Sequence, residues 1–196
     1  MAEVHLGLGS NLGNKAANLR AALRLLGRGQ PSLSPSAPST KLLAVSSLYR
    51  TAPVDYLDQD WFLNAAARIE TQLSPRELLM QLLAIERELG RVRTVRNGPR
   101  IIDLDILLWE DLIVSENDLV IPHPRLHERL FVLEPLAELA PGVRHPVLGM
   151  TIAECRAKLC AKSEELNSVL RIDGPEWAGI PGLGRGTARR VHGGTR

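Results

Sequence analysis

The fold prediction starts from one stretch, Gly98-Pro99-Arg100-Ile101-Ile102-Asp103-Leu104-Asp105-Ile106-Leu107-Leu108. From residue 101 to residue 108 the side chains are apolar apart from two acids, which is typical of a buried strand. Because strand side chains alternate, Asp103 and Asp105 should face the same way, roughly 6–7 Å apart. Two ionised carboxylates on one buried face repel each other and lose hydration, so positive charge must lie beside them. Two divalent cations about 3.5–4 Å apart would fit there.

Arginines cluster just before this strand. Four of them, Arg91, Arg93, Arg96 and Arg100, fall within ten residues. The guanidinium fork binds phosphate through two parallel hydrogen bonds. Mg²⁺ usually keeps water and substrate phosphates among its ligands, so two carboxylates would be enough protein ligands. The pattern indicates a site for a polyphosphate and its Mg²⁺. The structural alternative is that each acid caps a loop or pairs with an arginine.

The segments before this strand alternate between strand and helix periodicity. Residues 16–26 and 74–90 have apolar side chains at helical spacing. Ser74-Pro75-Arg76-Glu77 combines an N-cap, a proline at the first helical position and a capping-box glutamate. Strands are predicted at residues 4–9, 42–49, 62–73 and 101–108. The order is β-α-β-β-α-β, so we predict an α+β protein with a ferredoxin-like antiparallel sheet and helices packed on it.

The chain after residue 108 should add a hairpin and C-terminal helices. A strand or hairpin is predicted at 112–121, short helices near 125–129 and 131–139, and a last helix at 151–165. Residues 174–196 are rich in glycine and poor in apolar side chains, which is typical of a mobile segment. We therefore expect one domain over residues 1–170 and a flexible basic C-terminal tail over residues 171–196.

Charge is distributed unevenly along the 196 residues, whose formal net charge is +2. Residues 174–196 carry four arginines and one acid, which is +3 and leaves residues 1–173 at −1. A body of that charge is not a basic nucleic-acid binder. No run approaches the roughly 18 apolar residues that span a bilayer, and no secretory signal is recognisable. Cys155 and Cys160 fit no metal or redox spacing. A cytoplasmic enzyme without nucleic-acid or membrane partners is expected.

Two nucleotide-binding motifs are excluded. In Gly7-Leu8-Gly9-Ser10-Asn11-Leu12-Gly13 the third glycine comes one position too late for the dinucleotide fingerprint. The element order also lacks a helix that links parallel strands. No G-x-x-x-x-G-K-[ST] occurs, so the chain has no P-loop.

Two further segments have the composition of ligand-facing edges. His123 lies between two prolines and is followed by Arg125, Arg129 and Phe131, although a lone histidine is more often structural. Tyr56, Trp61 and Phe62 lie close to Asn64, in a chain with seven aromatic residues in all. Flat rings and one amide suit a planar heterocycle, since stacking gives energy and the amide reads a donor–acceptor edge. Core packing explains the same aromatics equally well.

Together these segments resemble the 6-hydroxymethyl-7,8-dihydropterin pyrophosphokinase family of folate biosynthesis, from about residue 4 to residue 152. The resemblance implies that ATP gives its β,γ-diphosphate to the pterin hydroxymethyl group and leaves as AMP. The blocks that carry the resemblance are Gly9-Ser10-Asn11-Leu12, Ser46-Ser47-Leu48-Tyr49-Arg50-Thr51-Ala52-Pro53, Phe62-Leu63-Asn64-Ala65-Ala66, Gly90-Arg91-Val92-Arg93 with Gly98-Pro99-Arg100 and Asp103-Leu104-Asp105, and Val120-Ile121-Pro122-His123-Pro124 with Arg129 and Phe131.

The resemblance also implies roles for individual residues. Asp103 and Asp105 would hold two Mg²⁺ ions, and with Arg91 and Arg100 they would form the catalytic set. A monomer that acts on ATP and the pterin, both small molecules, is expected. The ATP-binding residues would be Glu86, Arg91, Arg93, Arg100, Ile106, His123 and Arg129. The pterin-binding residues would be Gly9, Thr51, Val54, Phe62, Asn64 and Phe131.

The chain departs from the family pattern at several positions. Asn97 stands where many members carry an aromatic residue, so a stacking lid over the site is not carried over. Ala52 replaces a common proline, and Pro124 stands where an aromatic often follows the histidine. A different class of function, a non-catalytic ferredoxin-like binding module, is the alternative. The slightly acidic body and the lack of a ladder of surface aromatics argue against it.

Overall fold

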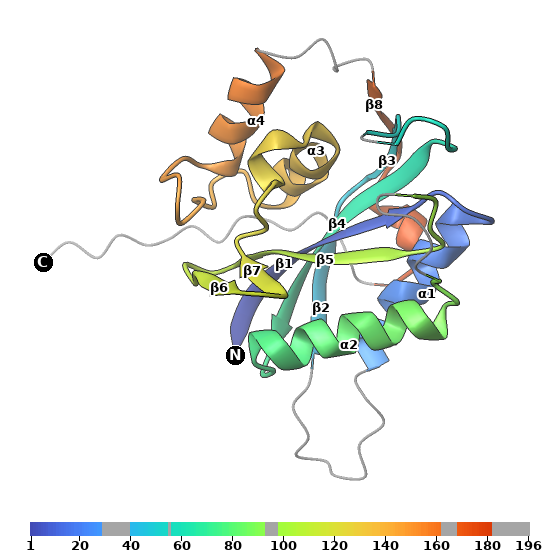
Figure 1. The fold of residues 1–196 in the computed structure, drawn as a ribbon, viewed down its shortest axis with the longest axis horizontal. Coiled ribbons are helices and arrows are strands. Elements are labelled where there is room, and N and C mark those ends of the chain that lie inside the picture. Colours follow the sequence, from blue (N-terminus) through green and yellow to red (C-terminus); the bar gives the residue numbers. More distant parts are fainter. Residues whose placement is uncertain (29–39, 55, 93–97, 162–167, 182–196) are drawn as a thin grey trace, which may run out of the picture.

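A computed structural model describes residues 1–28, 40–54, 56–92, 98–161 and 168–181 of the chain. Its centre is a six-stranded sheet in which every strand pair is antiparallel (Figure 1). The strand order is β5-β1-β4-β3-β8, and β2 also pairs with β4. The strands are β1 (Ala2–Ser10), β2 (Thr40–Val45), β3 (Leu48–Thr51), β4 (Phe62–Thr71), β5 (Asp103–Trp109) and β8 (Val169–Asp173).

Helices cover both faces of this sheet (Figure 1). α1 (Lys15–Arg28) and α2 (Pro75–Glu88) bury one face, where Val4, Leu6 and Leu8 of β1 lie in the larger hydrophobic cluster. α3 (Leu130–Leu139) and α4 (Ile152–Cys160) belong to a second cluster against the opposite face. The predicted α+β, ferredoxin-like antiparallel sheet is confirmed. Within the described ranges, no helix has both the length and the apolar character that crossing a membrane requires.

Local sequence signals set the ends of α2. The Ser74 hydroxyl accepts from the backbone N–H of Glu77, and the Glu77 carboxylate accepts from the Ser74 N–H at 2.7 Å. This reciprocal pair satisfies two backbone donors that have no partner inside the helix. Gly90, just beyond the helix, has a φ of +85°, a left-handed conformation that favours glycine. The predicted capping box is confirmed.

The single strand predicted at residues 42–49 is wrong, because two strands, β2 and β3, meet at Ser46 and Ser47. Ser46 still pairs with β4, donating its backbone N–H to the Ala66 carbonyl at 2.9 Å and accepting from the Ala66 N–H through its hydroxyl. Ser47 instead donates its N–H to the Glu138 side chain of α3 at 3.0 Å. At Ser47 the Glu138 carboxylate therefore takes the place of a backbone carbonyl of a neighbouring strand, and this interrupts the strand.

The segment after β5 follows the prediction more closely. A hairpin joins β6 (Val114–Glu116) to β7 (Leu119–Ile121), and a short 3₁₀ helix, η1 (Leu126–Glu128), precedes α3. The helix predicted at 151–165 begins as expected, at a capping box of Thr151 and Glu154, and ends at Cys160. Residues 162–167 lie outside the described residues.

The expectation of a flexible tail from residue 171 onward is wrong for residues 171–181. β8 pairs with β3 at the edge of the sheet, and η3 (Pro175–Ala178) follows it. Trp177 is 3% exposed and donates its indole N–H to the Ser46 carbonyl at 2.9 Å. Its own carbonyl accepts from Arg20 Nε of α1 at 2.6 Å. Burial of one large ring outweighs the glycine-rich composition on which the prediction relied. Residues 182–196 lie outside the described residues.

Candidate active site

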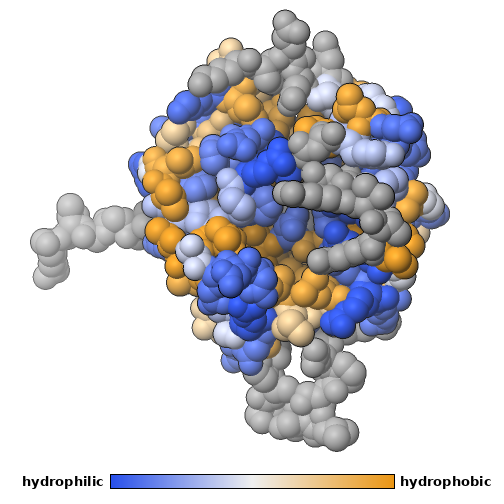
Figure 2. Space-filling view, in the orientation of Figure 1, coloured by the Kyte–Doolittle hydropathy of each residue, from blue (hydrophilic) through white to orange (hydrophobic). Residues whose placement is uncertain are grey.

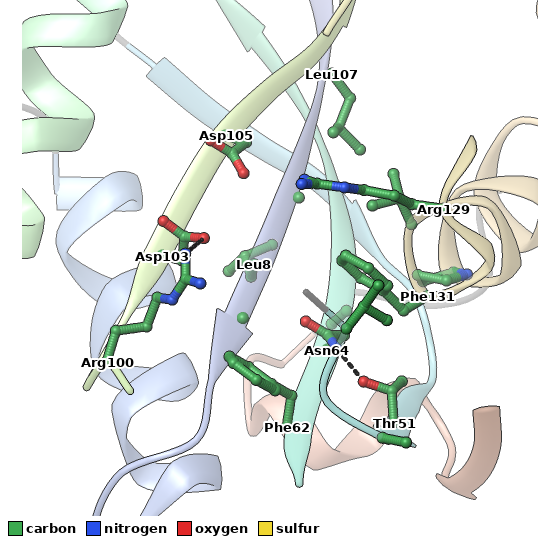
Figure 3. A pocket seen from close by; sticks show the side chains of 17 residues that line it. Leu8, Thr51, Phe62, Asn64, Arg100, Asp103, Asp105, Leu107, Arg129 and Phe131 are labelled. Atoms are coloured by element: carbon green, nitrogen blue, oxygen red, sulfur yellow. Dashed lines mark hydrogen bonds and ion pairs between the residues drawn. The ribbon is translucent and has the colours of Figure 1, made fainter. Parts of the chain in front are cut away.

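A cavity lies between the sheet and the N-terminal half of α3 (Figure 3). About 760 Å³ of space inside it is free of atoms, part of it open to solvent, which is within the usual size of a ligand pocket. Hydrophilic and hydrophobic groups lie side by side on the face shown in Figure 2. Ten residues predicted from the sequence line this cavity together: Gly9, Thr51, Val54, Phe62, Asn64, Arg100, Asp103, Asp105, Arg129 and Phe131.

Strand alternation places the acids as predicted. Leu104 and Ile106 point into the core beneath α1 and α2, while Asp103 and Asp105 line the cavity on the opposite face of β5. Arg129 and Phe131 reach the same cavity from the α3 side (Figure 3). The two carboxylates therefore share one wall of the cavity.

Asp103 pairs with an arginine through each of its oxygens. Arg91 Nη1 lies 2.6 Å from Oδ1, and Arg100 Nη1 lies 2.6 Å from Oδ2. Arg91 also binds Glu86, whose carboxylate accepts from the Leu104 backbone N–H at 2.8 Å. Burial raises the pKa of Glu86 above its ordinary value, against the opposing charge of Arg91. A chain of alternating charges thus links α2 to the start of β5.

Asp105 carries a different electrostatic signature from that of Asp103. Burial, together with the negative charges of Asp103 and Glu86, raises the pKa of Asp105 to about 7, against the opposing charges of Arg129 and Arg91. The carboxylate would ionise fully if more positive charge came close. A raised carboxyl pKa of this kind is expected at a site that binds a cation.

The donor chemistry of this wall fits a magnesium ion. Carboxylate oxygens are its preferred protein ligands. Within the described ranges no group of three or more His, Cys, Asp or Glu side chains could hold a metal by itself. A metal held by Asp103 and Asp105 would therefore need further oxygen ligands from water or from a bound phosphate, which is the usual situation for Mg²⁺.

The other end of the cavity is an aromatic slot with one amide in it. Phe62 of β4 and Phe131 of α3 border the slot, and Asn64 lies between them (Figure 3). The Asn64 amide donates to Thr51 Oγ1 at 2.7 Å, which fixes its orientation. A Cβ on Gly9 would lie 2.8 Å from Asn64 Oδ1, so only glycine leaves this amide in place.

Arginines connect the two ends of the cavity. The Arg100 guanidinium carbon lies 5.6 Å from the Phe62 ring centroid, and that of Arg129 lies 5.5 Å from the Phe131 ring centroid. These distances are within the range of cation–π attraction. Each ring of the slot therefore carries a cation that also faces the acidic wall.

The other predicted aromatics do not line the cavity. The Arg50 guanidinium carbon lies 4.5 Å from the Trp61 ring centroid, so that ring stacks on an arginine of β3. Tyr56 is 38% exposed. Of the three aromatics near Asn64, Phe62 is the one that borders the slot.

The remaining predicted residues lie around the cavity. Glu86 and Arg91 border a second, open hollow beside α2. Ile106 is 6% exposed, in the core. The His123 backbone N–H donates to the Leu107 carbonyl at 2.9 Å, and burial together with the charge of Arg129 lowers the pKa of His123 to about 4. Arg93, Arg96 and Asn97 lie outside the described residues.

Asn11 is a residue whose position the sequence did not reveal. Its Oδ1 accepts from the Arg100 N–H at 2.7 Å, and its own N–H donates to the Arg100 carbonyl at 3.1 Å. Its amide also donates to Gln59 Oε1 at 2.9 Å. Asn11 stood in a family block, but its spacing from Arg100 gives no periodic signal. It fixes the backbone from which Arg100 reaches Asp103.

The fold and the site define an α+β protein of ferredoxin-like type, with a cavity that joins an acid–arginine wall to an aromatic slot. Residues 5–141 match the family of 7,8-dihydro-6-hydroxymethylpterin-pyrophosphokinase (HPPK). The chain belongs to this family.

Named relatives support the assignment. A 2-amino-4-hydroxy-6-hydroxymethyldihydropteridine pyrophosphokinase of Methylorubrum extorquens is 48% identical over 81% of this chain and 94% of that protein. A protein of the same name from Bacillus subtilis is 47% identical over 71% of this chain and 78% of its own length. The folic acid synthesis protein fol1 of Schizosaccharomyces pombe is 41% identical, but the match covers 21% of its length.

Solved structures share the fold at low sequence identity. A Plasmodium falciparum HPPK-DHPS crystal structure has a TM-score of 0.68 and 18% identity. The similarity covers 87% of this chain and 46% of that one. It establishes the shared architecture and nothing finer.

Proposed function

We propose that this protein transfers diphosphate from ATP to the hydroxymethyl group of 6-hydroxymethyl-7,8-dihydropterin, giving AMP and the pterin diphosphate, in folate biosynthesis. The observation that carries the proposal is the joining, in one cavity, of an acid–arginine wall and an aromatic slot with an oriented amide. The family membership supports the same reaction.

The acid–arginine wall would take the triphosphate. Asp103 and Asp105 would hold Mg²⁺, which supplies neutralisation of the phosphate charge. Asp103 is paired with Arg91 and Arg100. On binding of Mg²⁺-ATP, Asp103 would exchange these arginines for the metal ion. The arginines would turn to the phosphates, to which their forked donors are suited. In such transfers the protein mainly positions groups and stabilises charge.

The remaining predicted ATP contacts would complete the nucleotide site. Arg129, at the N-cap of α3, faces the acidic wall (Figure 3) and would bind phosphate from that side. Glu86 and Arg91 border the hollow beside α2. Arg93, Ile106 and His123 remain predictions from the resemblance, as does the number of two Mg²⁺ ions.

The aromatic slot would take the pterin. Phe62 and Phe131 would stack on the ring system, and Asn64 would hydrogen-bond its edge. Thr51 and Val54 would offer backbone groups, and Gly9 would leave room for the Asn64 amide. The hydroxymethyl group would then point toward the phosphates, because the slot opens onto the wall that carries Asp103 and Arg100 (Figure 3).

The test is AMP formation from ATP and Mg²⁺, with and without 6-hydroxymethyl-7,8-dihydropterin. We expect AMP only with the pterin, and a loss of about a thousandfold in Asp105→Asn, because several kcal/mol of charge stabilisation disappears. Asp111→Asn, at an exposed acid just after β5, is the control and should keep full activity. Pterin-independent AMP would overturn the proposed pterin transfer, and no AMP at all would overturn it and favour a non-catalytic binding module.

A further inference from the structure

A carboxylate outside the cavity fastens α3 to the sheet. Glu138 lies near the C-terminal end of α3 and is not part of the cavity lining. Its Oε2 accepts from the Ser47 N–H at 3.0 Å and from the Tyr49 hydroxyl at 2.9 Å, and its Oε1 accepts from the Ser47 hydroxyl at 2.8 Å. Three donors on one partly buried carboxylate make a firm attachment, since hydrogen bonds to a charged group are stronger than neutral ones.

The sheet side of this attachment leads directly to the slot. Ser47 immediately precedes β3, Tyr49 lies within this strand, and Thr51 at its end lines the cavity. Tyr49 is the register partner of Asn64 on β4. Neighbours in register share a face of the sheet, so Tyr49 stands beside the amide that the slot depends on.

The helix side also leads to the slot. Phe131, Pro135 and Glu138 are four and then three residues apart, so they share one face of α3. Phe131 and Pro135 line the cavity. One end of this helix face therefore forms a wall of the slot, and the other end is held by the strand that forms the opposite wall.

Tyr49 is built to remain a donor in this arrangement. It is 7% exposed. Burial raises the pKa of Tyr49 above its ordinary value, and the charge and hydrogen bond of Glu138 raise it further. The hydroxyl therefore stays protonated throughout the neutral range and keeps its proton to donate to Glu138.

We propose that Glu138 is a positioning residue that sets the width of the slot between Phe131 on α3 and Asn64 and Thr51 on the sheet. The inference rests on the proposed function, since it assigns the slot to the pterin. Loosening the attachment would let α3 move away from the sheet, which should weaken pterin binding more than ATP binding. Of the proposed phosphate-binding arginines, Arg129 moves with α3, whereas Arg91 and Arg100 lie between α2 and β5 and would stay in place.

Glu134 provides a matched control on the same helix. It lies one turn before Glu138 and accepts from Arg156 Nε of α4 at 2.7 Å. That ion pair joins α3 to α4, and Glu134 acts on Tyr49 of the sheet through its charge rather than through a hydrogen bond. Glu134→Gln thus removes an acid and an inter-element contact from α3 without releasing the slot.

The experiment compares Glu138→Gln, Tyr49→Phe and Glu134→Gln in the full chain. Pterin affinity is measured by fluorescence titration, Mg²⁺-ATP affinity by calorimetry, and KM and kcat with both substrates. We expect Glu138→Gln to raise the pterin Kd and KM about tenfold and Tyr49→Phe about threefold, with the ATP Kd changed less than about twofold. Glu134→Gln should leave the pterin Kd within about twofold.

The pterin Kd of the variants decides whether Glu138 sets the width of the slot. An unchanged pterin Kd in Glu138→Gln, or an equal loss in Glu134→Gln, would overturn the proposal. If Glu138→Gln does not fold, Tyr49→Phe, which keeps the ring packing and removes one hydrogen bond, decides by the same criterion. A wild-type protein that binds no pterin would instead refute the proposed function itself.

Discussion

At the scale of single residues, the site depends on the space left free around the Asn64 amide. Its amide donates to Thr51, and Gly9 passes so close that a methyl group would meet the amide oxygen at 2.8 Å. The sequence marked Gly9 and Asn64 as members of two separate blocks. The two residues are register partners where β1 pairs with β4. Only this pairing shows that position 9 must be glycine so that the Asn64 amide fits beside it.

Gly9→Ala tests this close approach. The new Cβ should displace the Asn64 amide, and we expect pterin affinity to fall about tenfold or more, with Mg²⁺-ATP affinity nearly unchanged. Titrations with each ligand measure both. Gly27→Ala, where a Cβ would meet nothing within 4 Å, is the control. Equal pterin affinity in Gly9→Ala would show that the amide does not read the pterin edge.

His5 supplies a pH-dependent contribution to stability. It is 3% exposed, and among the described residues its ring nitrogens find no hydrogen-bond partner. Burial and then the charge of Arg68 lower the pKa of His5 from 6.5 to about 4, with Glu3 3.8 Å away. Between these values the unfolded chain binds more protons than the folded one, so stability falls as pH falls.

We expect up to about 3 kcal/mol of stability to be lost from this residue between pH 6.5 and pH 4. Urea unfolding across that range measures it. His5→Phe should show a smaller loss, because one of the titrating groups is gone while His123 and the carboxylates still contribute. Identical pH slopes in the variant and the wild type would contradict the assignment.

At the scale of elements, the edge strand β8 and its following turn act as one unit. β8 pairs with β3, the Ala52 N–H donates to the Ser168 carbonyl at 2.9 Å, and Trp177 buries its ring beneath the break between β2 and β3. The helix α2, in contrast, needs little tertiary help to define its N-terminus, since its capping box lies within four consecutive residues.

Trp177 variants separate ring burial from the indole hydrogen bond. Trp177→Phe should cost about 1–3 kcal/mol, since it loses the bond to the Ser46 carbonyl and part of the buried surface. Trp177→Ala should cost about 3–5 kcal/mol through the cavity that it leaves. Urea unfolding measures both values. An alanine variant as stable as the wild type would mean that residues 175–178 are not bound to the body.

At the scale of the whole molecule, ligand binding should stabilise the fold through the charges on β5. Asp103 is shared by two arginines, and Asp105 has a raised pKa among neighbouring acids. In bound Mg²⁺-ATP, the magnesium would lie beside the two acids and the phosphates would lie beside the arginines. A ligand that binds the folded chain at 100 times its Kd stabilises it by about 2.7 kcal/mol.

Thermal unfolding provides the corresponding measurement. ATP with Mg²⁺ should raise Tm by several degrees, and EDTA should remove most of that shift, because the acids would then face the triphosphate without a cation. Asp105→Asn should reduce the magnesium-dependent part. A shift of equal size with and without Mg²⁺ would contradict a metal site at Asp103 and Asp105.

Patterns along the chain were enough to predict what repeats at short range. These are the strand alternation that puts Asp103 and Asp105 on one face, the capping box of α2, and the strand–helix order up to β5 apart from the break at Ser46 and Ser47. Two long-range hydrogen bonds became visible only in the folded chain: the Ser47 N–H donates to Glu138, 91 residues away, and the Trp177 indole donates to the Ser46 carbonyl across 131 residues. The physical reason is that periodicity reports which face of an element is buried, whereas a hydrogen bond between distant residues leaves no periodic trace and exists only once the faces have met.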